Sequence, residues 1–557
     1  MRPGCIRTTV LCAAAGLLSI VDAARAQTEP FERDGVLVFP PDAAIPRFMT
    51  QAERAFWVRN PPPPPGGRGI ATPPTGPVRC VAEYEPMQGI LVSWIGSSSW
   101  LTILAQMGAQ ITTIGNADYD VIVPNAATQS SATSLLNGAG ANMSRVKFFT
   151  RTLDTIWIRD YGPRYIYQGN CRAIVDHTYN RPRPNDDAFS QWWGPQRKQP
   201  VYDIPLVHGG GNYHLNALGK SYATRLIANE NASLTEAQII AYWQSYQSVD
   251  THLFNAFPTS VDSTQHLDMW MQVLGDNKVV VSDWPANSGS TQDVICDNAA
   301  AYMQSQGYTV YRVPARQVSG THYTYTNVVM CNDLLLLPTY TNSTVVNAGY
   351  NAQALSTWKT AWGDTGTSAR KVVQVDCQAI VTSAGVMHCI VMHVPVPLGG
   401  VNPTAYIKSL NAAQTLTPGQ TVSIDWITDD DVSVSNVDVL LSRDGGATFP
   451  ITIAAATADD GTQTWTVPDF YTPKARVKVV ARDGGGRTGW DVNDADLIIN
   501  SSRCRGDYNL DGSVDDFDLF DFLNDFNAEN PAADFNGDAS VDDFDYFDFL
   551  NALGGPC

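Results

Sequence analysis

The segment TLDTIWIRDYGP (residues 152–163) ends an apolar run in an Arg-Asp pair and a Gly-Pro turn. We expect Asp160 to lie where a strand tip meets a cleft. From Cys80 to about Pro397, short apolar runs alternate with helix-like stretches. The runs include GILVSWIG (89–96), KVVVSDWP (278–285) and LLLLPTY (334–340), and one helix-like stretch is LTEAQIIAYWQSY (234–246). This alternation predicts an α/β fold.

Two further segments carry reactive side chains. In QHLDMW, His266 and Asp268 are two residues apart, a spacing that on a strand puts both side chains on one face. In AGVMHCIVMHVP, Cys389 precedes a β-branched run that is typical of a buried strand. Taken alone, Cys389 is compatible with inert core, with half of a disulfide to nearby Cys377, or with a nucleophile.

A cysteine, a histidine and two aspartates suit some chemistries better than others. A metal site is disfavoured, because no HExxH or paired CxxC occurs and the eight histidines are scattered. A papain-like Cys-His-Asn hydrolase stays open, but it does not need two aspartates. Two carboxylates with a thiol suit a guanidinium, which stays protonated and presents a planar fork of N–H donors. The aspartates would bind the fork, sulfur would attack the central carbon, and histidine would transfer protons.

The order and approximate spacing of five short motifs resemble the guanidino-group-modifying enzymes of the pentein superfamily: WIRDYGP, GGGNY (209–213), QHLDMW, YTNVVM (325–330) and MHC. Within it, the chain resembles bacterial (Porphyromonas-type) peptidylarginine deiminases and, more remotely, agmatine deiminases. The resemblance implies a five-bladed, pseudo-symmetric α/β propeller with the site in its central channel. It also implies hydrolysis of a linear amidine, with no cofactor for catalysis.

The resemblance assigns roles to individual residues. Cys389 is similar to the family's nucleophile, and His266 to the general acid/base that protonates departing ammonia and then activates water. Asp160 and Asp268 resemble the guanidinium clamps, and Asn327 the asparagine that supports the cysteine. Loss of ammonia would leave a covalent thiouronium-like intermediate, and its hydrolysis would leave citrulline.

The segment YNRPRPND separates the subfamilies. Arg181 and Arg183 each have a proline beside them and form a stiff pair. In bacterial peptidylarginine deiminases an equivalent pair binds the α-carboxylate of a C-terminal arginine, which agmatine lacks. The resemblance therefore favours peptidyl arginine over agmatine or free arginine, whereas a solvated basic loop is the alternative interpretation. Trp157 would pack against the aliphatic stem of the substrate.

The length of the chain and its N-terminal sequence predict a division into several segments. The 557 residues are too many for one hydrophobic core. A basic n-region, a short apolar core and an Ala-Arg-Ala site before Gln27 form a secretory signal, and no later stretch reads as a transmembrane helix. We expect a secreted, periplasmic or cell-envelope protein. Its predicted parts are a signal peptide (1–26), an N-terminal segment with a proline-rich linker (27–79), a catalytic domain (80–400), an Ig-like sandwich (401–500) and a calcium-loop module (501–557).

The number of cysteines and the distribution of charge along the chain give two further expectations. Eight cysteines remain after the signal, an even number that permits full pairing, and Cys504 with Cys557 is the favoured pair. Residues 501–557 hold 14 Asp and Glu against two Arg, a net of −12, so the rest carries −7 of the total −19. The acidity lies mainly in the tail, and nucleic-acid binding is disfavoured throughout.

The segment after the catalytic region alternates short runs with Asp-Gly turns. The runs are TVSIDWI, VDVLLS, TWTVP and ARVKVVA. Together they predict an antiparallel sandwich of immunoglobulin size, about 100 residues. It resembles the Ig-like modules appended to secreted bacterial enzymes, and a spacer role is the expectation.

The tail contains a repeat, in which residues 506–526 and 533–553 are similar. Each copy spaces oxygen ligands at loop positions 1, 3, 5, 7 and 12, as a calcium ion requires, and Gly512 allows a sharp bend. The ligands are Asp507, Asn509, Asp511, Ser513 and Asp518, and then Asp534, Asn536, Asp538, Ser540 and Asp545. Duplicated loops with Asp at position 12 resemble dockerin modules, which implies two calcium ions and a cohesin-like docking partner. Phe517, Phe520, Phe522, Phe544, Phe547 and Phe549 would form the buried seam and part of the docking face.

Three functional hypotheses stay open. The first is a secreted deiminase tethered through its calcium module and acting on arginine-containing peptides. The second is an agmatine or free-arginine deiminase. The third, of another class, is a scaffold-bound protein that has lost activity and only binds arginine-rich chains. The intact cysteine, histidine and aspartate pair argues against the third.

Overall fold

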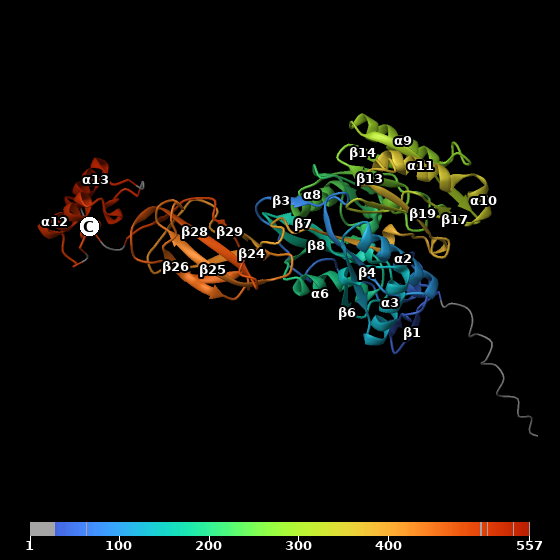
Figure 1. The fold of residues 1–557 in the computed structure, drawn as a ribbon, viewed down its shortest axis with the longest axis horizontal. Helices are drawn as coiled ribbons and strands as arrows, with labels where there is room; N and C mark the ends of the chain where they lie inside the picture. The colour runs from blue at the N-terminus through green and yellow to red at the C-terminus, as the bar shows by residue number, and fades with distance from the viewer. Residues whose placement is uncertain (1–27, 63, 502–503, 510, 538–539, 556–557) are drawn as a thin grey trace, which may run out of the picture.

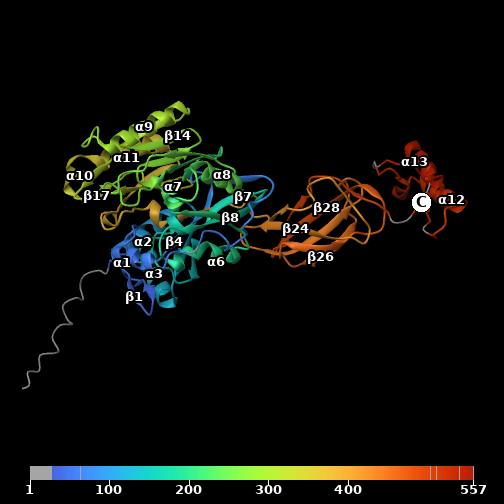
Figure 2. The same cartoon turned by 180° about the vertical axis from the view of Figure 1, so that it is seen from behind.

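The computed structural model describes residues 28–62, 64–501, 504–509, 511–537 and 540–555. The predicted signal peptide, the calcium ligand Asp538 and the disulfide partner Cys557 lie outside these residues. Figures 1 and 2 show an α/β region, a β-rich region and two C-terminal helices that follow one another along the long axis.

Five sheets of the α/β region share one pattern. Each begins with an antiparallel pair of strands and ends with a parallel pair. The first two are β21-β4-β5-β6 (Met392–Pro395, Met87–Ser93, Asp118–Val123, Val146–Thr150) and β3-β7-β8-β9 (Val78–Cys80, Arg164–Gln168, Cys171–Tyr179, Val201–His208). The others are β10-β11-β12 (His214–Leu215, Lys220–Thr224, Asp250–Phe254), β13-β14-β15 (Met271–Gly275, Lys278–Asp283, Thr309–Pro314) and β18-β19-β20 (Val329–Cys331, Leu334–Thr339, Lys371–Asp376). The predicted α/β class is confirmed, and the propeller arrangement of the five sheets stays a prediction.

Helices connect the parallel strands, as crossovers between parallel strands require. They are α2 (Ser98–Thr113), α3 (Ala126–Ala139), α6 (Phe189–Gln196), α8 (Glu236–Gln247), α9 (Thr291–Ser305) and α11 (Tyr350–Trp362), with the short α5 (Pro184–Asp187), α7 (Leu226–Glu230) and α10 (Ser343–Asn347). Helix α8 matches the predicted helix-like stretch. Thr235 and Gln238 form its capping box, and the helix buries Ile239, Trp243 and Tyr246.

The N-terminal segment forms a hairpin and a helix beside the α/β region. Strands β1 (Phe31–Arg33) and β2 (Val36–Val38) pair antiparallel, and α1 (Gln51–Arg59) follows. Thr50 and Glu53 form a capping box at the start of α1. The chain between β2 and α1 is buried at Ala43, Ile45 and Arg47.

The β-rich region has two sheets on one core, and the predicted runs are found in its strands. One sheet is β22-β24-β27 (Thr404–Ile407, Thr421–Asp429, Thr462–Thr466). The other is β23-β30-β28-β25-β26 (Gln414–Leu416, Leu497–Ile499, Thr472–Asp483, Val434–Ser442, Ile451–Thr457), with β29 (Thr488–Val492) on β28. A buried ion pair, Arg172 with Asp429 at 2.8 Å, joins this region to the α/β region.

The C-terminal helices α12 (Asp516–Asn527) and α13 (Asp543–Leu553) pack through aromatic rings. Phe522 and Phe549 are fully buried and stacked, with ring centroids 4.2 Å apart. The predicted buried seam is wrong for the other four phenylalanines, which are more than half exposed: Phe517, Phe520, Phe544 and Phe547. Each lies two or five residues before Phe522 or Phe549 in its helix, and at 3.6 residues per turn both offsets place the side chain on the opposite face, toward solvent.

Six cysteines of the described residues are buried free thiols: Cys80, Cys171, Cys296, Cys331, Cys377 and Cys389. Full disulfide pairing is therefore wrong, and so is the alternative bond between Cys377 and Cys389. Burial raises the pKa of the thiol in each case, to about 11 for Cys80 and about 12 for Cys331. None of the helices in the described part of the chain is long and apolar enough to cross a membrane.

Candidate functional site

The predicted aspartates, histidine and cysteine lie on short helical turns. Asp160 is in α4 (Ile158–Tyr161), His266 precedes the 3₁₀ turn η3 (Leu267–Met269) that holds Asp268, and Cys389 is in η5 (His388–Ile390). Asp160, His266 and Asp268 therefore do not lie at a strand tip or on a strand, whereas the buried run after Cys389 does contain a strand, β21. A left-handed residue, Gln265 with φ +60°, turns the chain just before His266. The turns still bring all these side chains together, because each contacts one guanidinium.

That guanidinium belongs to Arg47 of the N-terminal segment, and it is fully buried. Its Nε and Nη2 donate to Asp160 (2.9 and 2.8 Å), and its Nη1 and Nη2 donate to Asp268 (both 3.1 Å). Nη1 also donates to the Cys389 sulfur at 2.7 Å, and Nη2 lies 2.7 Å from His266 Nδ1. Two bidentate carboxylates, a thiol and an imidazole therefore surround one planar cation, as guanidinium recognition requires.

Asn327 holds the cysteine turn in place. Its Nδ2 lies 3.2 Å from Cys389 Sγ, and its Oδ1 accepts the His388 backbone N–H at 3.0 Å. Asn327 and its neighbour Thr326 are fully buried. The amide thus fixes the sulfur relative to the backbone that carries it.

A second layer of charge supports Asp268. His388 Nδ1 lies 3.0 Å from Asp268 Oδ2, and its Nε2 lies 2.9 Å from Glu83. Glu83 also accepts from Arg159 Nη1 at 2.8 Å, and Arg159 Nε donates to the His388 carbonyl. His388 therefore positions Asp268 rather than contacting the guanidinium. His214 lies beside Glu83 and His388, and the potential ligand atoms of these three residues lie within 4.8 Å of one another.

Burial and the bound cation set the charges in the site. Burial would raise the pKa of Asp160 and of Asp268, but Arg47 holds both below their usual range. Burial and Arg47 lower the pKa of His266, against the influence of Asp160. Burial raises the pKa of the Cys389 thiol well above its ordinary value, whereas Arg47 lowers it. A guanidinium in this position therefore opposes the effect of burial on the pKa of the thiol but does not cancel it.

The glycines of GGGNY leave room for these groups. A Cβ on Gly211 would overlap Arg47 Nη2 and would lie 2.8 Å from Asp268 and 2.9 Å from Asp160. A Cβ on Gly209 would lie 2.7 Å from the His266 ring. The Gly211 N–H also donates to Asp160 Oδ1 at 3.1 Å. The motif therefore forms one wall of the guanidinium site.

We expect Gly211→Ala to lower kcat/KM for an arginine peptide by about 100-fold or more, because the methyl group displaces the guanidinium while every charge stays. Steady-state citrulline assays would measure the loss. The control is Gly138→Ala in α3, where a Cβ meets no atom within 4 Å. Equal activity of the two variants would contradict the assignment of this wall.

The predicted substrate-binding residues contact backbone on both sides of Arg47. Trp157 Nε1 donates to the Ile45 carbonyl at 2.9 Å, and Arg181 Nε donates to the Arg47 carbonyl at 3.3 Å. Arg183 Nη2 donates to the Pro46 carbonyl at 2.7 Å.

Arg183 is fully buried and its Nε pairs with Glu53 at 2.7 Å, so a solvated basic loop is wrong for this residue. Arg181 is partly buried. The arginine pair is thus part of the site and not an exposed loop.

Sequence reasoning missed Arg47, Glu53 and Glu83. Arg47 and Glu53 lie in the N-terminal segment (27–79), in which the sequence predicted no site residue. Thr50 followed by Glu53 has the spacing of a capping box, which could have indicated α1. Nothing in the local sequence distinguishes Arg47 from other arginines, because its partners are 113 to 342 residues away.

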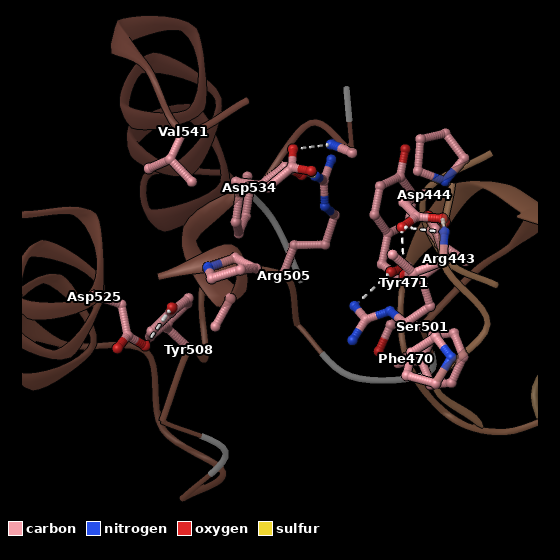
Figure 3. Close-up of a pocket in the computed structure, with 18 of the residues that line it drawn as sticks. Arg443, Asp444, Phe470, Tyr471, Ser501, Arg505, Tyr508, Asp525, Asp534 and Val541 are labelled. Atoms are coloured by element: carbon pink, nitrogen blue, oxygen red, sulfur yellow. Dashed lines mark hydrogen bonds between the residues drawn. The ribbon is translucent and has the colours of Figure 1, made fainter. Parts of the chain in front are cut away.

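A separate cleft of about 1060 Å³ lies between the β-rich region and the C-terminal helices (Figure 3). Arg443 and Tyr471 line one side, and Tyr508 and Asp534 line the other. Arg505 lies between them, with its guanidinium 3.8 Å from the Tyr471 ring centroid. The cleft holds none of the residues around Arg47, so it is distinct from the candidate active site.

Comparison with known proteins gives a family match for the part of the chain that holds most of this site. A family model, Porphyromonas-type peptidyl-arginine deiminase, matches residues 79–395. Similar solved structures include a Porphyromonas gingivalis protein assigned as an arginine deiminase (18% identity, 57% of this chain and 98% of that chain, TM-score 0.49). Agmatine deiminases of C. jejuni (16%, 57% and 96%, TM-score 0.47) and Enterococcus faecalis (16%, 58% and 99%, TM-score 0.49) are also similar. The matched residues include Asp160, His266, Asp268, Asn327 and Cys389, whereas Arg47 lies outside them.

Proposed function

Because the chain belongs to the Porphyromonas-type peptidyl-arginine deiminase family, we propose that it converts peptidyl arginine to citrulline and ammonia. Family membership makes it a deiminase of the pentein type, a hydrolase that acts on C–N bonds of amidines. In the proposed reaction Cys389 attacks the guanidinium carbon, and His266 gives a proton to departing ammonia and then activates water. Asp160 and Asp268 hold the cation, and Asn327 holds the sulfur.

One observation supports a peptidyl substrate. The arginine in the site is part of a chain, and Trp157, Arg181 and Arg183 donate to three of its successive carbonyl groups. Agmatine has no such carbonyls, so these donors would be left unused with it. Arg181 contacts the carbonyl of the bound arginine itself, and at a chain end that group is a carboxylate. This supports the proposed preference for C-terminal arginine.

The substrate class is tested by citrulline release from four compounds: a peptide ending in arginine, the same peptide with an internal arginine, free arginine and agmatine. We expect the rate of citrulline release to fall in the order in which these compounds are written. The peptide ending in arginine should be fastest, because its carboxylate pairs with Arg181 and Arg183. Turnover of agmatine alone would contradict the peptidyl substrate. No turnover of any compound, with unchanged peptide binding by Cys389→Ser, would favour the binding protein.

Two further proposals concern location and attachment. The leader before Gln27 supports export to the periplasm, the cell envelope or the medium. The duplicated loops and helices support a dockerin-like module that binds a cohesin-like partner. The exposed pairs Phe517, Phe520 and Phe544, Phe547 supply apolar surface for such docking.

The residues of the calcium loops fit a hard cation. Asp507 is buried, its Oδ2 accepts the Gly512 N–H at 2.9 Å, and its Oδ1 has no hydrogen-bond partner. Gly512 has φ +90°, which the sharp loop requires. In the second loop Asp545 accepts two backbone N–H groups, from Asn536 and Asp542, just as Asp518 does in the first. Calcium would supply the charge that holds each ring of oxygens together.

We expect chelation of calcium to unfold residues 503–557 and to leave citrulline formation unchanged, because the proposed ion ligands lie only in the tail. Limited proteolysis and the citrulline assay would be run on the same sample. Asp507→Ala combined with Asp534→Ala is the control, and its proteolysis pattern should not respond to chelator. Loss of activity on chelation in a chain that ends at residue 500 would contradict this separation.

A further inference from the structure

The N-terminal segment occupies the candidate active site as a substrate would. The Arg47 guanidinium meets the sulfur of Cys389, the imidazole of His266 and both aspartates. Its backbone is held as well, since the Arg47 N–H donates to the Ser383 carbonyl at 2.9 Å. Arg47 therefore contacts the same groups that we propose to bind and attack a substrate arginine.

The segment is anchored by a second ion pair. Glu53 caps helix α1 through Thr50 and pairs with Arg183 at 2.7 Å, and both charged groups are fully buried. Burial would raise the pKa of Glu53, but Arg183 holds it below its usual value. The segment therefore covers the two arginines that we propose for binding substrate backbone, so a second peptide cannot enter while it stays.

The charge of Arg47 is what keeps it there. Burial alone would lower the pKa of Arg47, but Asp160 and Asp268 raise it well above its ordinary value. Each carboxylate is in turn compensated mainly by Arg47. A neutral side chain in the same place would leave two buried carboxylates without their main cationic partner, which is strongly unfavourable.

We propose that Arg47 is the first substrate of its own chain: it is converted to citrulline in cis, and the neutral product releases the segment and opens the site. This inference rests on the proposed deiminase function. Cys389 Sγ forms a bond to Cζ, the thiol proton passes through His266 to Nη2, and the Cζ–Nη2 bond breaks to release ammonia. Water, deprotonated at His266, then adds to Cζ, and the C–S bond breaks. The net reaction takes guanidinium and water to a ureido group and ammonium.

The inference predicts a modification and a change in kinetics. Purified wild-type chain should carry citrulline at position 47, up to one per chain, by peptide mass spectrometry. Cys389→Ser should keep arginine there. Freshly made wild-type chain should show a lag in citrulline release from an added arginine peptide. Arg47→Ala and Arg47→Gln should show no lag, and the second variant keeps a polar, neutral side chain in case the first folds poorly.

A mixing experiment tests whether the reaction is in cis. Cys389→Ser chain is incubated with active Arg47→Gln chain, and its position 47 is analysed. We expect it to stay arginine, because its own site buries the guanidinium. Conversion in this mixture would overturn the cis reaction.

The remaining outcomes separate this inference from the proposed function. If Arg47→Gln deiminates the added peptide while wild-type chain keeps arginine at 47, the self-reaction is overturned and the deiminase function stands. Arginine at 47 in wild-type chain with no turnover by any variant would overturn both. Citrulline at 47 in wild-type chain only, together with the lag, would support the inference.

Discussion

Cys389→Ser should lower the rate of citrulline formation by about 10⁴-fold or more, because a nucleophile and its base act as a unit whose removal costs most of the rate. The hydroxyl is a much weaker nucleophile than a thiolate, and the sulfur is the atom that meets Nη1 of the bound guanidinium at 2.7 Å. The measurement is single-turnover citrulline formation in the Arg47→Gln background, where the tethered arginine does not compete. The substitution removes no charged group, so peptide binding should change by no more than a few-fold.

The matched control is Cys377→Ser. This thiol is also fully buried and free, but no atom of the guanidinium site contacts it among the described hydrogen bonds. The same atomic change there should lower stability and leave kcat within a few-fold. If the two variants lose activity equally, the effect is structural and Cys389 is not the nucleophile.

The elements of the α/β region were largely predictable because their signals are local. The runs beginning at residues 89, 278 and 334 are the buried strands β4, β14 and β19, and a capping box marks α8. Apolar runs and caps act within one element, so their pattern survives in a single sequence.

The conformation around the reactive residues was not predictable in the same way. His266 and Asp268 were expected to share one face of a strand, but they contact the same guanidinium from a 3₁₀ turn. The spacing of two residues is compatible with both conformations. What decides between them is the left-handed Gln265 and the packing around it, and neither has a local sequence signal.

Arg47 shows more clearly what could not be predicted from the sequence. The two aspartates and the thiol indicated a guanidinium as the bound group, yet they gave no sign that the chain supplies one itself. The ion pairs join residue 47 to residues 160 and 268. Contacts over such distances depend on the whole fold, and an isolated arginine in a polar segment is as compatible with solvent exposure as with burial.

Asp268→Asn should lower kcat/KM for an arginine peptide by roughly 10²- to 10⁴-fold, since removing one charge of a buried pair costs about 3–5 kcal/mol and each decade is about 1.4 kcal/mol. The hydrogen-bond partners of this carboxylate are donors: Arg47 Nη1 and Nη2 at 3.1 Å, His388 Nδ1 at 3.0 Å and the Cys389 thiol at 3.5 Å. An amide has the same shape, but its NH₂ group must face one of these donors. The loss should appear in both KM and kcat, because the guanidinium is held less well and the Cys389 thiol loses its contact with the Asp268 carboxylate.

The amide should also loosen the N-terminal segment, and this readout separates loss of recognition from loss of folding. In Asp268→Asn, proteolysis near Arg47 should become faster while the α/β region resists cleavage as before. The control is Asp297→Asn, which weakens a largely exposed pair with Arg312 and should change neither measurement by more than twofold, since exposed pairs contribute little. If Asp268→Asn keeps near wild-type kcat/KM with a folded α/β region, Asp160 alone recognises the guanidinium and the two-carboxylate site is wrong.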